Sequence, residues 1–261
     1  CRMRKDFITF RSITPAQRAQ RLLRHSGIEA VLQRTPGYLR ERGCSYCLRL
    51  RSWEIDRAAA VLQRENIPFV CVDAHLPASS PLPMVEVDYY DAAYQATRYL
   101  HRNGHTDIGF IGPETPVEHC ANTFRGYTDY LRENDLTCNS QWVAKIPFAE
   151  QSAEAAVDAL LEYDALPTAL LCSCDAVAID VIRRLKERGI RIPEDISAVG
   201  IDDLLVSRYL DPALSTMTFD KELLGAKAME LLYQLIQGAE HQNRNTIRTT
   251  LVERSSVKKI G

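Results

Sequence analysis

Residues 189–203 read Gly-Ile-Arg-Ile-Pro-Glu-Asp-Ile-Ser-Ala-Val-Gly-Ile-Asp-Asp. Gly189 is the residue type that commonly ends a helix, and Pro193 prevents the helix from resuming because it lacks the backbone N–H that a helix interior needs. The apolar run 196–201 then predicts a buried strand, which Asp202 and Asp203 follow directly. The stretch therefore predicts a helix end, a short loop, a strand and two carboxylates at the carboxyl end of that strand.

The same alternation of helix and strand extends over the chain from residue 67 onward. Expected strands lie at 67–73, 84–88, 107–111, 142–146, 168–172, 196–201 and 248–253. Expected helices, with apolar residues at helical spacing, lie at 91–102, 121–133, 151–162, 175–188 and 221–237. Short strands separated by amphipathic helices are typical of parallel sheets with crossover helices, so the sequence predicts an α/β fold.

Composition limits the class of protein. The 261 residues are 46% hydrophobic, enough to fill the core of one large domain or two ordinary ones. No apolar run approaches the roughly 18 residues of a membrane helix, and no signal segment is recognisable, so we expect a soluble, cytoplasmic protein without a membrane partner. Several of the eight cysteines sit in apolar strand-like runs, which favours buried, reduced thiols.

The first 66 residues are harder to interpret, with one expected helix at 14–33 and one weak strand at 44–50. Residues 1–51 carry 12 Arg and Lys against 3 Asp and Glu. This excess fits either a basic face near a nucleic acid or a solvated arginine-rich helix. Cys44 and Cys47 have zinc-knuckle spacing, but no second ligand pair completes four ligands, so we predict no metal site.

Several ordered motifs resemble the lactose/galactose repressor (LacI/GalR) family. They are Asn-Gly-His-Thr-Asp-Ile-Gly-Phe-Ile-Gly at 103–112, Phe-Arg-Gly-Tyr at 124–127, Leu-Pro-Thr-Ala at 166–169, the stretch 189–203, Asp-Pro-Ala-Leu-Ser-Thr at 211–216, Leu-Gly at 224–225 and Leu-Val-Glu-Arg-Ser-Ser at 251–256. The resemblance covers residues 66–257 well and residues 1–65 poorly.

The resemblance implies two similar lobes joined by three crossovers, each a parallel sheet with helices on both faces, as in periplasmic sugar-binding proteins of type I. The expected N-terminal lobe is 1–103 plus 221–240, and the expected C-terminal lobe is 105–219 plus 246–261. The family's helix-turn-helix DNA-binding domain, about sixty residues long and upstream, is not recognisable in this chain.

The resemblance also implies a function. A small-molecule effector, by default a sugar or derivative, would bind between the lobes of a homodimer and change its affinity for operator DNA through the upstream domain. Ligands of open parallel sheets bind beyond the carboxyl ends of the strands. That rule selects Asp202 and Asp203 after one strand, Cys174 and Asp175 after another, and 88–91 after a third.

Two carboxylates match effector-contacting positions of the family. Asp202 lies at the family's Gly-aromatic-Asp-Asp motif, where a carboxylate accepts hydrogen bonds from ligand hydroxyls or amines; a simple turn residue is the alternative. Asp91, fourteen residues before His105, matches a sugar-contacting position, but it could instead cap the following helix.

Three further candidate residues lie just after the strand 168–172 or upstream of it. Asp175 is either an effector contact or the N-cap of the helix at 175–188, and Cys174 stands where many relatives carry Asn or another polar residue. Phe148, 27 residues before Asp175, has the spacing of an aromatic residue that stacks on the effector, although a core residue is the alternative.

One departure from the family pattern concerns the cation that grips the effector. Thr123 stands where the family commonly has this arginine, three residues before Gly126. Arg125 is two positions further along, a helical rotation of about 200°, and cannot replace it. His119 could supply a polar contact or be a loop surface residue. The effector of this protein could therefore differ from the family's usual sugar.

Two other classes of function compete with this interpretation. A periplasmic solute-binding protein would share the architecture, but the cysteines and the stretch 251–256 argue against it. An enzyme would need catalytic or cofactor motifs, and the sequence contains no GxSxG, P-loop, HExxH or GxGxxG pattern. We therefore expect neither catalysis nor a cofactor.

Overall fold

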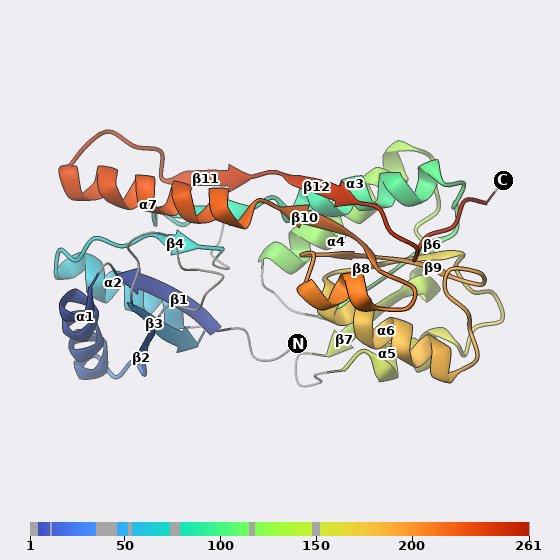
Figure 1. Ribbon diagram of the computed structural model, residues 1–261, viewed down its shortest axis with the longest axis horizontal. Helices are drawn as coiled ribbons and strands as arrows, with labels where there is room; N and C mark the ends of the chain where they lie inside the picture. The colour runs from blue at the N-terminus through green and yellow to red at the C-terminus, as the bar shows by residue number, and fades with distance from the viewer. Residues whose placement is uncertain are drawn as a thin grey trace. The chain divides into compact units, whose positions relative to one another are not determined.

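The protein is described by a computed structural model for residues 5–10, 12–34, 46–51, 54–73, 79–114, 118–147 and 152–260. The chain divides into two compact units. The first contains residues 88–219 and 248–261, and the second contains residues 2–87 and 220–247. The chain passes between the units at the three boundaries of these ranges, as the order of colours in Figure 1 shows.

The first unit is built on a six-stranded sheet in the order β12-β10-β9-β8-β6-β7. Its strands are β6 Ile108–Glu114, β7 Val143–Pro147, β8 Ala169–Cys172, β9 Ser197–Ile201, β10 Ser215–Phe219 and β12 Thr249–Val252. All neighbouring pairs are parallel except β10 and β12, which are antiparallel. Strands β8 and β9 are buried along their whole length, as the apolar runs predicted.

Helices cover both faces of this sheet. They are α3 Tyr89–Arg102, α4 Glu118–Glu133, α5 Glu154–Leu160 and α6 Asp175–Glu187. Residues of α5 and α6, including Val157 and Val181, share a core with Leu170 and Ala198 of the sheet. Figure 1 shows α3 and α4 on the opposite side. The expected α/β fold is confirmed for this unit.

A glycine brings α3 and α4 together. A Cβ added at Gly126 would lie 2.2 Å from the backbone oxygen of Tyr90, so only glycine permits this approach of the two helices. The contact continues outward, where the Tyr90 hydroxyl donates to Asp129 Oδ2 at 3.1 Å. The glycine of the Phe-Arg-Gly-Tyr motif therefore has a packing role.

The packing of α3 also sets the boundary between the units. We expected the N-terminal lobe to extend to residue 103, but the division falls between Val87 and Asp88. The reason is that α3 packs against α4 and against strands β8, β9 and β12, all of which belong to the first unit.

The second unit contains two three-stranded sheets. The first sheet is parallel, with the order β11-β5-β4, and α7 Lys221–Gln237 contacts it. Its strands are β4 Cys71–Val72, β5 Met84–Val87 and β11 Arg244–Ile247. The second sheet is antiparallel, with the order β1-β3-β2, and packs with the helices α1 Ile13–His25 and α2 Ile55–Arg64. Its strands are β1 Lys5–Phe10, β2 Val31–Arg34 and β3 Tyr46–Arg51. One continuous core joins residues of both sheets, including Leu48 and Met84.

This unit differs most from expectation. The helix expected over 14–33 ends at His25, because Gly27 adopts a φ of +71° and the chain then forms β2. The strand expected at 67–73 is only two residues long, and α2 and β11 were not predicted. The antiparallel sheet replaces the parallel βα units that the family resemblance implied for the first lobe.

Buried cysteines agree with the prediction of core thiols. Cys71 and Cys172 are buried within β4 and β8, and Cys47 is buried in β3. Cys44, the other residue of the zinc-knuckle spacing, lies outside the described residues. Among the described residues no group of three His, Cys, Asp or Glu side chains could hold a metal ion.

The C-terminal segment is fixed to the first unit by the motif at 103–105. Gly104 has a φ of +91°, and a Cβ there would lie 1.6 Å from the Ile260 carbonyl oxygen. His105 is fully buried; its Nε2 lies 3.1 Å from the Lys258 carbonyl oxygen, and its Nδ1 lies 3.0 Å from Thr168 Oγ1. A carbonyl can only accept, so Nε2 carries the proton of a neutral imidazole. Burial lowers the pKa of His105 from its ordinary 6.5.

We expect this histidine to make stability depend on pH. When the pH falls below about 6.5, the unfolded chain binds the proton before the folded chain does, so the free energy of unfolding decreases. Urea unfolding of the wild type and of His105→Gln at pH 7.5 and 5.5 measures the effect. The variant should lose less stability over this interval, and an equal loss in both proteins would contradict the assignment.

Candidate functional site

The carboxyl ends of five parallel strands meet at one edge of the first unit's sheet. The order β10-β9-β8-β6-β7 places the segments that follow β6, β8 and β9 side by side at this edge. Residues 173–175 follow β8, and Asp202 and Asp203 follow β9. Because ligand groups converge at such an edge, these neighbouring segments form the candidate site.

Asp175 holds the edge together from within. Its side chain is fully buried and accepts three hydrogen bonds: from the Leu204 backbone N–H at 2.9 Å, from the Ser207 hydroxyl at 2.5 Å and from the Thr216 hydroxyl at 2.5 Å. The carboxylate thereby connects α6, strand β10 and the segment after β9. Burial raises the pKa of Asp175, and its three hydrogen bonds oppose that shift.

The buried carboxylate requires a glycine beside it. A Cβ added at Gly200 on β9 would lie 2.3 Å from Asp175 Oδ1. The glycine of the stretch 189–203 therefore makes room for Asp175. The sequence allowed Asp175 to be the N-cap of its helix, but Cys174 occupies that position and Asp175 is the first helical residue. Both carboxylate oxygens of Asp175 accept internal hydrogen bonds in the described geometry.

Asp202 and Asp203 leave β9 in an unusual backbone conformation. Their φ angles are +114° and +47°, a region that side-chain-bearing residues seldom adopt and that is often found at functional sites. The Asp202 N–H donates to the Met217 carbonyl at 2.8 Å. Both side chains are half-buried. Asp202 therefore lies at the predicted edge, on a turn that its neighbours hold in place.

An ion pair anchors the second aspartate. Arg254 Nη2 lies 2.6 Å from Asp203 Oδ1, and both side chains are only 14% exposed. The same guanidinium donates from Nη1 to the Leu214 carbonyl at 2.7 Å. The arginine of the stretch 251–256 thus fixes the turn after β9. No sequence pattern indicates this partner, because the two residues are 51 positions apart.

Ser173 is a further polar residue at this edge, and it was not among the residues predicted from the sequence. Its hydroxyl oxygen is buried and has no hydrogen-bond partner among the described residues. Its backbone N–H donates to the Ile111 carbonyl at 2.9 Å, which places it between the ends of β6 and β8. No spacing in the sequence distinguished this serine from the cysteines beside it.

The other predicted residues lie in several environments. Cys174 is half-buried at the start of α6, at the same edge. Thr123 is 1% exposed within α4, so it faces the protein interior. The Arg125 guanidinium lies over the Tyr90 ring of α3, with Cζ 5.1 Å from the ring centroid. Phe148 and the side chain of His119 lie outside the described residues.

Asp91 lies in the first turn of α3. The sequence allowed Asp91 to be the N-cap, but Asp88 fills that role, since its Oδ1 accepts from the Asp91 backbone N–H at 2.9 Å. The half-buried Asp91 carboxylate accepts from Gln95 Nε2 at 3.2 Å. The contacts described for Asp91 stay within its own helix and its cap, and none of them joins it to Asp202.

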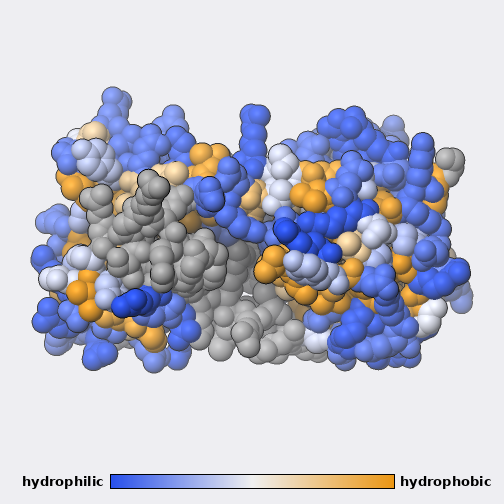
Figure 2. All heavy atoms as spheres, in the orientation of Figure 1, coloured by the Kyte–Doolittle hydropathy of each residue, from blue (hydrophilic) through white to orange (hydrophobic). Residues whose placement is uncertain are grey.

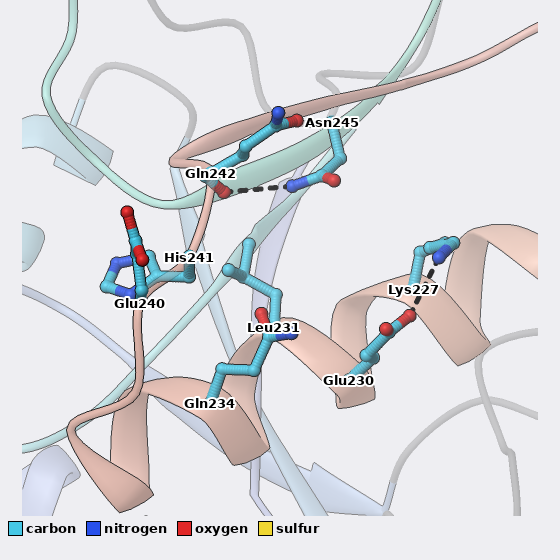
Figure 3. Close-up of a pocket in the computed structure, with 8 residues that line it drawn as sticks. All are labelled: Lys227, Glu230, Leu231, Gln234, Glu240, His241, Gln242 and Asn245. Atoms are coloured by element: carbon cyan, nitrogen blue, oxygen red, sulfur yellow. Dashed lines mark hydrogen bonds and ion pairs between the residues drawn. The ribbon is translucent and has the colours of Figure 1, made fainter.

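A separate polar groove lies in the second unit, between α7 and the segment before β11 (Figure 3). Its walls consist of Lys227, Glu230, Leu231, Gln234, Glu240, His241, Gln242 and Asn245. Two of its polar contacts are internal: Lys227 Nζ lies 2.8 Å from Glu230 Oε2, and Asn245 Nδ2 donates to the Gln242 carbonyl at 3.0 Å. None of the predicted site residues lines this groove.

Comparison with known proteins gives the class to which this fold and site belong. The family model described as periplasmic binding protein-like domain matches residues 97–257. This match covers more than half of the chain, and the chain belongs to that family. The resemblance to LacI/GalR regulators is also confirmed, as the following relatives indicate.

The HTH-type transcriptional repressor PurR of Vibrio vulnificus is 33% identical over 196 residues, which are 75% of this chain and 58% of the repressor. The chain therefore spans less than two thirds of the length of this curated relative. A solved LacI-family sugar-binding transcriptional regulator from Escherichia coli, complexed with phosphate, has a TM-score of 0.69 at 26% identity, covering 81% of this chain and 74% of the regulator. The Escherichia coli repressor ascG has a TM-score of 0.66 at 25% identity, with 80% and 75% covered.

The N-terminal part is similar to a different family. A model described as Se/S carrier protein-like matches residues 6–70. This range contains the antiparallel sheet β1-β3-β2 with α1 and α2, where the repressor motifs are weak. The separate similarity accounts for the poor family resemblance of residues 1–65.

We expect Gly200→Ala to lower the free energy of unfolding by about 1–3 kcal/mol, because its methyl group overlaps Asp175 Oδ1. In an Asp175→Ala background the same change should cost at least about 0.5 kcal/mol less, since that oxygen is absent. Urea unfolding of the wild type, both single variants and the double variant measures this coupling.

Gly238→Ala is the matched control. Gly238 has a φ of +65° and nothing within 4 Å of an added Cβ, so its cost should be the same in both backgrounds. Strictly additive costs for Gly200→Ala and Asp175→Ala would refute direct contact between the two residues.

Proposed function

We propose that the chain is the effector-sensing and dimerisation part of a LacI/GalR-type transcription regulator. The observation that carries this proposal is the carboxyl edge of the six-stranded sheet, where Asp202 and Asp203 follow β9 and the buried Asp175 fixes the segment beside them. Operator DNA would be bound by a helix-turn-helix domain outside residues 1–261, as in the HTH-type relatives.

The proposed effector is a small polar molecule that donates hydrogen bonds. A half-buried carboxylate such as Asp202 accepts from hydroxyl or amino groups. Cys174, at the same edge, is a weak hydrogen-bond former. A sugar is the default because one relative is described as sugar-binding. Thr123 is buried and uncharged, so the effector need not carry the group that the usual arginine grips. Asp91, Phe148, Asp175 and His119 remain proposals as effector contacts.

Effector binding would regulate the protein by population shift. A ligand can favour one arrangement of the regulator only if its affinity differs between the two arrangements. The turn at Asp202 suits this role, because Asp202 is joined to β10 and Asp203 is joined to Arg254 of the C-terminal segment. A ligand contact there would be transmitted to both.

We propose a homodimer that uses the short helix η4 Leu205–Tyr209. Leu205 is 69% exposed and Tyr209 is 75% exposed, and Leu204 and Val206 beside them are also exposed. Buried Ser207 and the Leu204 N–H hold this segment on Asp175. Exposed apolar side chains on a rigid support, interrupted here by Arg208, are a common feature of protein interfaces.

The alternative is a periplasmic solute-binding protein with the same architecture. Similarity to transcription repressors and the buried cysteines favour the regulator, and with it a cytoplasmic location. None of the helices in the described ranges has the length and apolar character needed to span a bilayer. We propose no catalytic activity, because the named relatives are regulators.

We expect a thermal-shift screen of sugars and nucleobases to yield a stabilising ligand, since a ligand that binds only the folded state raises the melting temperature. Asp202→Ala should weaken its binding at least about tenfold, which corresponds to the loss of a charged hydrogen bond. Calorimetric titration measures the dissociation constants.

Asp164→Ala, at an exposed position of the same unit, is the control and should bind like the wild type. A ligand that binds Asp202→Ala with unchanged affinity would exclude the proposed site. Turnover of the ligand would support an enzyme instead.

We expect the wild type to sediment at twice the mass of one chain, and Leu205→Asp with Tyr209→Asp to sediment as a single chain. Two buried carboxylates would oppose association across an apolar contact. Tyr163→Asp, at a residue 41% exposed elsewhere in the unit, should leave the dimer intact. A dimer that survives the double change would exclude this interface.

A further inference from the structure

Helix α1 carries a continuous polar face that the proposed function does not use. The exposed residues of this face are Thr14, Gln17, Arg18, Arg21, Arg24 and His25. At about 100° per residue they fall within an arc of roughly 120°. Ala16, Ala19 and Leu23 on the opposite side are buried in the core of the second unit. The buried side fixes the direction in which the arginines point.

No acidic residue balances these arginines within the helix. The sequence of α1 contains three arginines and one histidine but neither Asp nor Glu. The ion pairs of the described residues include none with Arg18, Arg21 or Arg24. The exposed acid that follows the helix, Glu29, pairs with Arg51 at 3.0 Å. The positive charge of the face is therefore uncompensated among the described residues.

A second arginine-rich helix shows that the chain does compensate arginines elsewhere. On α6, Arg183 lies 2.5 Å from Glu154, and Arg184 lies 2.5 Å from Asp158. The next arginine, Arg188, also lies 2.9 Å from Asp158. These three arginines are each paired with a carboxylate, whereas the ion pairs of the described residues include none for the arginines of α1.

The chemistry of the face limits what could bind it. A helix that binds membranes needs an exposed apolar side to insert among lipids, but the apolar side of α1 is buried in the core. Binding of single-stranded nucleic acid uses aromatic side chains for base stacking, and this face has none. Arg, Gln and Thr are side chains that contact the phosphates of a duplex. At the lower left of Figure 2, where Figure 1 draws α1, blue hydrophilic atoms lie beside orange hydrophobic ones.

We propose that the α1 face binds the phosphate backbone of duplex DNA without reading its sequence. Each phosphate that an arginine neutralises releases counterions, so affinity depends steeply on salt. This contact would be additional to that of the proposed helix-turn-helix domain. It belongs to the segment that is similar to the Se/S carrier-like family and not to the periplasmic binding protein-like part.

The test is fluorescence anisotropy of the 261-residue chain with a labelled duplex of arbitrary sequence, from about 50 to about 200 mM salt. We expect binding at low salt, and we expect Arg18→Gln/Arg21→Gln/Arg24→Gln to weaken it at least about tenfold. The plot of log affinity against log salt has a negative slope, and its magnitude should decrease in the variant by up to about 2.7. This is about 0.9 for each phosphate that is no longer neutralised. Glutamine retains helix propensity, and circular dichroism checks the fold.

Arg183→Gln/Arg184→Gln/Arg188→Gln, in the C-terminal part of α6 and at its C-cap, is the matched control with the same charge change and should bind duplex like the wild type. Three outcomes would overturn the proposal: no duplex binding by the wild type, equal weakening in both triple variants, or binding only to phosphatidylserine vesicles. Failure of the effector screen would leave this result unaffected, because the two surfaces belong to different units.

Discussion

The buried carboxylate of Asp175 is the interaction on which the candidate site depends. It receives three hydrogen bonds, two from the segment after β9 and one from β10, and Gly200 leaves space for it. A buried carboxylate is costly unless its hydrogen bonds are satisfied, so Ser207, Thr216 and the Leu204 amide must remain in place together. The segment 202–209 is held on the sheet for this reason.

Asp175 thus holds both the proposed effector site and the proposed dimer surface in place. At one end of the segment, Asp202 is presented at the carboxyl edge on a turn fixed by Arg254 and Asp203. At the other end, Leu205 and Tyr209 are exposed to solvent. A ligand that displaces the turn would also strain the contacts of η4. This shared anchor is a physical route by which effector binding and dimer geometry can be coupled.

The sequence was informative where burial follows a simple period. The apolar runs predicted β8 and β9 because both faces of these strands are covered, and the edge position of Asp202 followed from its place directly after the strand 196–201. Strand β10 was missed because it begins with Ser215 and Thr216, whose hydroxyls are buried against partners about 40 residues away. The role of Asp175 was missed for the same reason: its partners become neighbours only when the sheet forms. The first 66 residues do not follow the strand and helix pattern of the repressor family, and residues 6–70 are similar to a different family.

Amide hydrogen exchange at Leu204 tests the central claim most directly. If the Asp175 carboxylate holds the segment, the Leu204 N–H exchanges slowly in the wild type and at least about tenfold faster in Asp175→Ala. The Ile260 N–H, which donates to the Asn103 carbonyl at 2.8 Å elsewhere in the unit, should keep its protection in both proteins. Equal exchange at Leu204 in the wild type and the variant would contradict the account.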